Sequence, residues 1–111
     1  MNDWPTALRV NAFTRAVEAA GGSAMVLARG DRDSGVVLLL AIDRAGTARL
    51  LERERDLDGN SRIVHHKPDL VADRDLTPYW QERRRRDPDL WVVEAIVAAA
   101  EPLAAETLWA D

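Results

Sequence analysis

The chain has 111 residues, of which 47% are hydrophobic and 31% charged, and this balance predicts one globular domain over residues 1–111. It has no cysteine, which excludes a disulfide scaffold, a thiolate metal site and a cysteine nucleophile. Fifteen basic against nineteen acidic residues give a net charge of −4. Phosphate contacts supply most of the affinity of duplex-DNA binders, so a chain with a net negative charge is not expected to bind nucleic acid. The net charge does not exclude a local basic patch.

The longest uninterrupted apolar run, residues 36–42, is far shorter than the roughly 20 residues that cross a bilayer. The first residues lack the basic patch and apolar stretch of a secretion signal. We therefore expect no membrane partner and a cytoplasmic location.

Residues 6–20 predict an amphipathic helix, because apolar side chains recur at helical spacing while Arg9 and Arg15 take other angles. Residues 24–29 predict a strand, and a polar turn follows. Residues 36–42 are apolar without alternation, which predicts a central strand buried on both faces.

Residues 47–55 fit either a strand or a helix, and the turn signals on both sides favour a strand. Residues 61–67 are expected to return as its hairpin partner. A two-residue loop at Asp58 and Gly59 would then place Glu52 opposite His65.

Thr77 and Pro78 predict the start of a second helix that runs to about Arg86, and residues 90–97 predict a fifth strand. Residues 94–111 form an atypical alanine-rich segment. The sequence pattern permits a short helix over 102–109 but does not require it. The order helix, four strands, helix, strand predicts an α+β domain with a mostly antiparallel sheet and the helices packed on one face.

Two segments carry a family resemblance. The first is residues 21–35 with the turn Arg-Gly-Asp-x-Asp-x-Gly, and the second is Asp-Pro-Asp-Leu-Trp-Val-Val-Glu at 87–94. In order and separation they resemble domain of unknown function 1491 (DUF1491), an uncharacterised bacterial family, over roughly residues 7–94. The resemblance implies a small compact bacterial protein and supplies no activity, substrate or catalytic residue. The end after residue 94 looks unlike the family.

Asp31 and Asp33 invite comparison with a calcium loop, but Gly35 comes one residue early and no glutamate follows at the required distance. Aspartate and glycine favour turns without a metal, so we predict turn chemistry here. A magnesium nuclease site is a weak interpretation, because the one lysine, Lys67, precedes both Pro-Asp pairs. We assign no catalytic residue, no metal site and no cofactor.

The first functional hypothesis is a non-enzymatic binding or protein-interaction module, expected to be a homodimer. The apolar string at 95–100 motivates it, because such a string is too adhesive to stay exposed on a monomer. Tryptophan is also enriched at interfaces. The candidate interface residues are Trp4, Leu103, Leu108 and Trp109.

The alternative is an enzyme or ligand-binding protein for an anionic molecule, phosphorylated or resembling a nucleic acid. It would use Arg29, Asp31, Asp33, Arg83 and Arg86, and it requires these residues to converge in space. Residues 83–86 are four arginines that wrap around a helix axis, so a solvated helix end is the leading interpretation for them.

Overall fold

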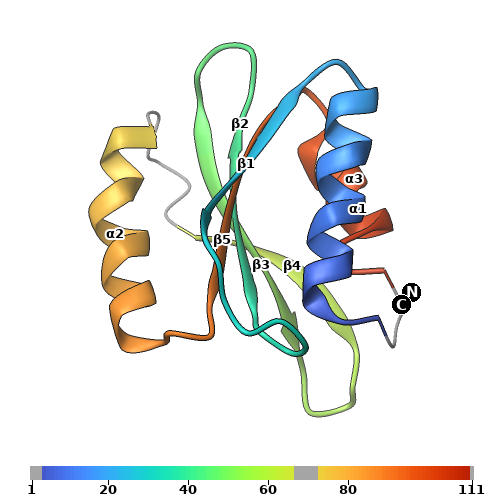
Figure 1. Ribbon diagram of the computed structural model, residues 1–111, viewed down its shortest axis with the longest axis vertical. Coiled ribbons are helices and arrows are strands. Elements are labelled where there is room, and N and C mark those ends of the chain that lie inside the picture. The colour runs from blue at the N-terminus through green and yellow to red at the C-terminus, as the bar shows by residue number, and fades with distance from the viewer. Residues whose placement is uncertain (1–3, 67–72, 111) are drawn as a thin grey trace.

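The computed structural model describes residues 4–66 and 73–110, which form three helices and a five-stranded sheet (Figure 1). The helices are α1 (Thr6–Ala19), α2 (Asp73–Arg86) and α3 (Ala100–Glu106). The strands are β1 (Ser23–Ala28), β2 (Val37–Ile42), β3 (Ala48–Arg55), β4 (Ser61–His66) and β5 (Trp91–Ile96). The strand order is β1-β5-β2-β3-β4, and every neighbouring pair is antiparallel except β2 with β5. The α+β class, the element order and the mostly antiparallel sheet are confirmed.

Strand β2 lies at the centre of the sheet, as its apolar sequence predicts. Leu39 and Ala41 belong to the core on one face, and Leu38 and Leu40 to the core on the other. All four side chains are at most 3% exposed. Residues 47–55, which fitted either a strand or a helix, form strand β3 beside it.

The prediction that the helices pack on one face is wrong. Helices α1 and α3 cover one face of the sheet and α2 covers the other (Figure 1). Phe13 of α1 and Ala104 of α3 belong to the first core, whereas Leu76 of α2 belongs to the second. The physical reason is β2: a strand with apolar side chains on both faces needs apolar cover on both.

Two helix boundaries differ from the sequence prediction. Helix α2 begins at Asp73, so Pro78 lies inside it rather than at its first position. Leu76, before the proline, is fully buried against the sheet, and we attribute the earlier start to this packing. Helix α3 begins at Ala100, which places Pro102 in its first turn, where a missing N–H is tolerated.

The β3–β4 hairpin has a longer loop than predicted. Residues 56–60 form it, because the Asp56 carboxylate accepts hydrogen bonds from the backbone N–H groups of Asp58 and Asn60, at 3.0 and 2.9 Å. Gly59 takes a φ of +85°, which glycine adopts without strain.

This loop shifts the register of the two strands by one residue. Glu52 is paired with Val64 rather than with His65, which lies opposite Leu51. Since a shift of one residue exchanges the faces of a strand, His65 and His66 trade places relative to the prediction.

The two segments of the family resemblance pack against each other. The backbone N–H of Asp31 donates to the Asp89 carbonyl at 2.9 Å, and the Trp91 indole N–H donates to the Asp31 carbonyl at 2.7 Å. A Cβ atom on Gly30 or Gly35 would collide with the Asp89 carbonyl oxygen. These glycines therefore permit the close approach of two turns that are far apart in the sequence.

Candidate functional site

The first three residues of the predicted anion site lie in the turn after β1 and already have partners. The Arg29 guanidinium lies over the Trp91 ring, 5.1 Å from its centroid. The Asp31 carboxylate accepts hydrogen bonds from the Ser34 backbone N–H at 2.8 Å and from its hydroxyl at 3.0 Å. These bonds lower the pKa of Asp31, the backbone bond most. Asp33 is exposed and its backbone N–H donates to Asp31 at 3.2 Å.

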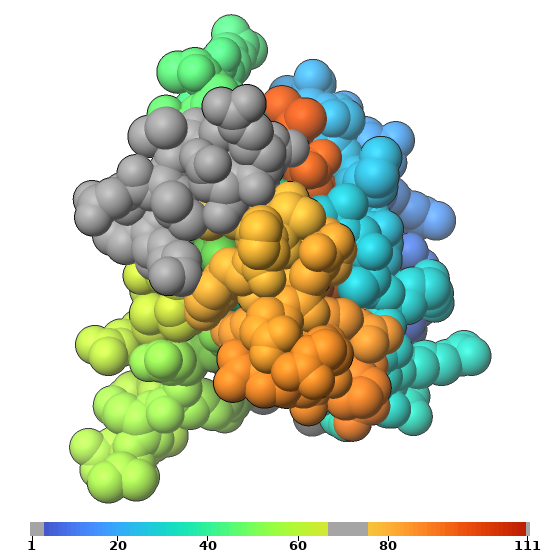
Figure 2. All heavy atoms as spheres, turned by 90° about the vertical axis from the view of Figure 1, so that its left-hand side faces the viewer, coloured from blue at the N-terminus to red at the C-terminus, as the bar shows by residue number. Residues whose placement is uncertain are grey.

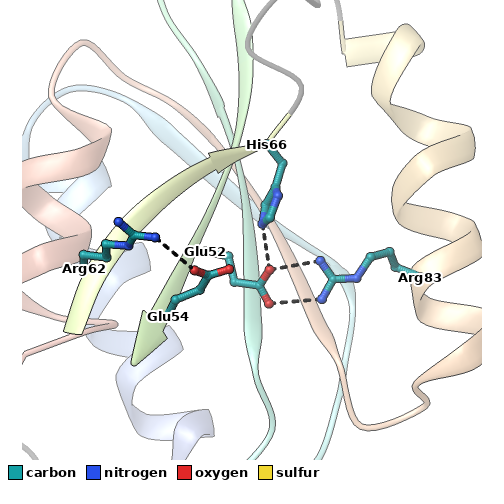
Figure 3. A network of polar contacts seen from close by, with 5 residues as sticks. All are labelled: Glu52, Glu54, Arg62, His66 and Arg83. Atoms are coloured by element: carbon teal, nitrogen blue, oxygen red, sulfur yellow. Dashed lines mark hydrogen bonds and ion pairs between the residues drawn. The ribbon is translucent and has the colours of Figure 1, made fainter. Parts of the chain in front are cut away.

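The two arginines of that predicted site are paired with carboxylates. Arg83 forms a bidentate ion pair with Glu52, with both nitrogen–oxygen distances at 3.0 Å (Figure 3). Arg86 lies 3.6 Å from Glu82, which also binds Arg85 at 2.7 Å. The arginine that reaches the turn is Arg84, which donates to the Arg29 carbonyl at 2.7 Å. The structure thus brings the turn and the end of α2 together through a residue that the sequence analysis did not select.

Glu52 is the centre of a polar cluster that joins β3, β4 and α2 (Figure 3). His66 Nε2 lies 2.9 Å from the Glu52 carboxylate, on the oxygen that Arg83 also binds. Burial raises the pKa of Glu52, but the hydrogen bonds and charges of Arg83 and His66 outweigh it, so the pKa lies below its ordinary value. The expected partner His65 instead contacts Glu101 of α3 at 2.9 Å.

Three of the four predicted interface residues pack in or against the core, and the fourth is exposed. Leu108 and Trp109 are 2% and 7% exposed and belong to the core under α1 and α3. Leu103 is half-buried and packs against the same core, whereas Trp4 is 48% exposed. The apolar side chains at the C-terminal end therefore cover this chain's own sheet, and they do not form an outward surface.

Segments from the two ends of the described chain lie close together (Figure 1). A groove is lined by residues of both segments. Its volume is about 250 Å³, and we call it the terminal groove. Its lining comes from the start of α1, the turn before β2, strand β3 and the segment after α3. The lining residues are Trp4, Thr6, Arg9, Asp33, Ser34, Gly35, Val36, Val37, Arg53, Leu108 and Trp109.

Arg9 holds the walls of the terminal groove in place. Its Nε donates to the Trp4 carbonyl at 3.1 Å, and its Nη1 donates to the carbonyls of Leu108 and Ala110 at 3.2 and 3.3 Å. Arg9 is 7% exposed, although the helical pattern predicts a position off the apolar face. Its spacing from Phe13, four residues later and fully buried, was the signal that could have located it.

A second cavity of about 380 Å³ continues the terminal groove along the β3–β4 hairpin. The two share Arg53 and Trp109, and the second adds Arg62, Ser61 and Glu101 to the lining. Arg62 is well exposed and lies 3.7 Å from Glu54.

Residues 4–66 and 73–110 contain no group of three or more metal-ligating side chains placed to hold an ion. Within these same ranges, no helix has the length and apolar character needed to span a membrane.

Comparison with known families matches residues 5–105 to "Protein of unknown function (DUF1491)". The chain belongs to the DUF1491 family. The match extends beyond residue 94, the predicted end of the resemblance, and includes most of α3.

Solved DUF1491 structures have the same fold. A DUF1491 crystal structure from Caulobacter crescentus CB15 is 34% identical, with a TM-score of 0.78 over 88% of this chain and 92% of that one. An NMR structure of a DUF1491 protein from the same organism is 33% identical, with a TM-score of 0.70 over 91% and 92%. Protein Atu0922 from A. tumefaciens, solved in solution, is 25% identical, with a TM-score of 0.74 over 91% and 92%. No curated protein matches the chain. The DUF1491 description assigns no activity.

Proposed function

We propose that this DUF1491 protein is a non-enzymatic interaction module that forms a homodimer through the outer edge of strand β1. The observation that carries the proposal is an uncharged strand at the margin of the sheet. In the part of the chain that the structure describes, β5 is the one strand that pairs with β1.

The two edges of the sheet differ in chemistry. Strand β1 reads Ser-Ala-Met-Val-Leu-Ala and has no charged residue or proline, whereas β4 at the other edge carries Arg62, His65 and His66. Proteins usually place charges or proline on edge strands to prevent pairing with another chain. A bulge between Val26 and Ala28 disturbs the end of β1, so we assign the pairing to residues 23–26.

Exposed apolar side chains lie next to this edge. Met25 is 60% exposed, and Ile96, whose strand neighbour is Ser23, is 43% exposed. Met25 lies on the face of the sheet opposite to Ala24 and Val26, which pack under α1. Figure 2 shows that face, with the light-blue and cyan atoms of β1 and the following turn beside α2.

Two-fold antiparallel pairing of β1 with its copy would satisfy its outer backbone groups. It would also bring the two Met25 side chains close together across the interface. This surface replaces the one predicted from the sequence, because Leu108 and Trp109 are occupied in the core. Of the apolar string that motivated the dimer, Ile96, Ala98 and Ala99 remain exposed.

The test is the molar mass in solution, measured by light scattering after size exclusion. We expect twice the chain mass of 12.4 kDa for the natural protein and one chain mass for Met25→Lys. The matched control is Leu57→Lys, because Leu57 is a fully exposed apolar residue at the tip of the β3–β4 hairpin, and this variant should stay dimeric. A monomeric natural protein, or dimers that persist in Met25→Lys, would overturn the proposal.

A further inference from the structure

The terminal groove combines guanidinium groups, indole rings and a rigid frame, and it is a different surface from the β1 edge. We propose that it binds a small anionic ligand that carries a planar ring. This inference does not depend on the dimer, and it concerns residues other than the five first considered for an anionic ligand, apart from Asp33.

The charge of the lining favours an anion. Arg9 and Arg53 both line the groove, and among the described lining residues Asp33 is the one carboxylate. Arg9 contributes positive charge only, because its Nε and Nη1 donate to backbone carbonyls. The chain as a whole carries a net charge of −4, so this positive lining is a local exception. The guanidinium group matches carboxylate and phosphate with paired N–H donors, which makes these two anions the expected ligand groups. The adjoining cavity adds one cation, Arg62, and one carboxylate, Glu101, so it leaves the net charge of the combined lining unchanged.

The aromatic lining favours a planar group. Trp4 contributes a half-exposed indole ring to the groove and Trp109 a largely buried one, and Val36 and Val37 add apolar surface. Trp4 is 48% exposed and Val36 46%, so a large apolar area of this site faces solvent in the protein alone. An indole face binds rings by stacking, and a ligand ring held there would remove this apolar surface from water.

The frame of the groove is fixed by hydrogen bonds within the protein. Arg9 holds the carbonyls of Trp4, Leu108 and Ala110. The Thr6 hydroxyl, also on α1, donates to the Gly35 carbonyl at 3.1 Å and so ties the helix to the turn before β2. A site whose walls are held in this way loses little conformational freedom on binding, which is a property of ligand sites rather than of surface irregularities.

The size of the groove limits the ligand. A volume of about 250 Å³ is slightly below the range of about 300–1,000 Å³ for drug-sized ligands, so it suits one ring with one anionic substituent. The adjoining cavity of about 380 Å³ provides room for a longer substituent that would reach Arg62.

Isothermal titration calorimetry with three probes tests the inference. Phenyl phosphate has both the ring and the anion, inorganic phosphate has the anion alone, and benzyl alcohol has the ring alone. We expect phenyl phosphate to bind at least about tenfold more tightly than either of the others, which corresponds to about 1.4 kcal/mol. No measurable binding of phenyl phosphate, or equal binding of inorganic phosphate, would overturn the inference.

Variants assign the binding to this groove. Trp4→Ala and Arg53→Gln should each weaken phenyl phosphate binding about tenfold. The matched controls are Leu8→Ala, which removes a side chain as exposed as Trp4 from outside the groove lining, and Arg15→Gln on the exposed side of α1. Both controls should bind as the natural protein does. Trp4 is half exposed, so Trp4→Ala keeps the test valid if Arg53→Gln does not fold, and unchanged binding in Trp4→Ala would contradict the assignment.

Met25→Lys should bind phenyl phosphate as tightly as the natural protein, because Met25 is not part of the groove lining. This variant separates the two proposals, since either can fail while the other stands.

Discussion

Two glycines, Gly30 and Gly35, allow the two family motifs to pack closely against each other. Gly30 and Gly35 lie against the Asp89 carbonyl, where a side chain has no room, and neither adopts a positive φ. Their role is therefore close approach rather than backbone freedom. The calcium-loop alternative is not needed to explain the motif, because Asp31 already serves the turn through its hydrogen bonds to Ser34.

Replacing Gly30 by alanine should destabilise the protein by about 3 kcal/mol, at the upper end of the range for overpacking. The same change at Gly59, which has open space but a φ of +85°, should cost about 1 kcal/mol. Urea unfolding at one fixed protein concentration measures both values. If Gly30→Ala were no less stable than Gly59→Ala, the close contact with Asp89 would not matter.

The Glu52 cluster predicts a pH dependence. The folded pKa of Glu52 lies below its ordinary value, so its ion pairs contribute stability above the unfolded pKa of about 4.3, and this contribution is lost as the pH falls through the folded pKa. Glu52→Gln should therefore reduce the free energy of unfolding at pH 7 by about 1–3 kcal/mol, and the difference should shrink below about pH 4.

The control for this prediction is Glu54→Gln. Glu54 is half exposed and its pair with Arg62 is longer, at 3.7 Å, so the change should cost less than about 1 kcal/mol. Urea unfolding across a series of pH values measures both variants. If Glu52→Gln lowered the free energy of unfolding by the same amount from pH 7 to pH 3, the charge of Glu52 would not contribute to stability.

The sequence pattern predicted the burial of some side chains correctly and missed that of others. It placed Val10, Phe13 and Val17 correctly on the buried face of the first helix, because apolar periodicity records burial. It missed Arg9, because the charge of an arginine suggests exposure unless nearby carbonyls are available to accept its hydrogen bonds. Those carbonyls come from Leu108 and Ala110, about a hundred residues away.

At the scale of elements, the β3–β4 register shows how one loop controls a site. The turn signals correctly predicted a hairpin, but Asp56 caps a five-residue loop instead of a two-residue one. Because of this register shift, His66 contacts Glu52 and His65 contacts Glu101. Loop length depends on which side chain bonds which backbone group, and composition alone does not specify this.

Helix α3 and the residues after it should be essential to the core. Leu108→Ala should reduce the free energy of unfolding by about 2–5 kcal/mol, because Leu108 is 2% exposed under α1 and α3. The same substitution at the fully exposed Leu57 should change it by less than about 0.5 kcal/mol. Thermal unfolding of the two variants at equal concentration provides the comparison. An unchanged midpoint in Leu108→Ala would mean that this segment is not part of the core.

At the scale of the whole molecule, two apolar cores share one sheet. Strand β2 supplies side chains to both, so the two cores are joined through one strand. The order β1-β5-β2-β3-β4 also places β5 next to β2, although β5 comes after α2 in the chain. The sheet is thus completed only when a late segment inserts between two early ones.

We therefore predict a single cooperative unfolding transition. Far-ultraviolet circular dichroism, which follows the helices, and tryptophan fluorescence should give the same midpoint. Trp80 of α2 contributes to the fluorescence from one face of the sheet, and Trp91 and Trp109 contribute from the other. Separate midpoints would mean that the two layers unfold independently.

Local patterns in the sequence determined the approximate positions of the first two helices, the strands and the hairpin turns, and the burial of the central strand, because periodicity and turn residues act over a few neighbouring positions. They also marked the two motifs of the DUF1491 family. The tertiary structure alone decided that β5 lies between β1 and β2, that α2 covers the opposite face from α1 and α3, and that Arg9 and Arg53 line one groove. These arrangements join residues that are far apart in the chain, and the choice among distant partners depends on packing and hydrogen bonding in space, which leave no periodic trace in the sequence.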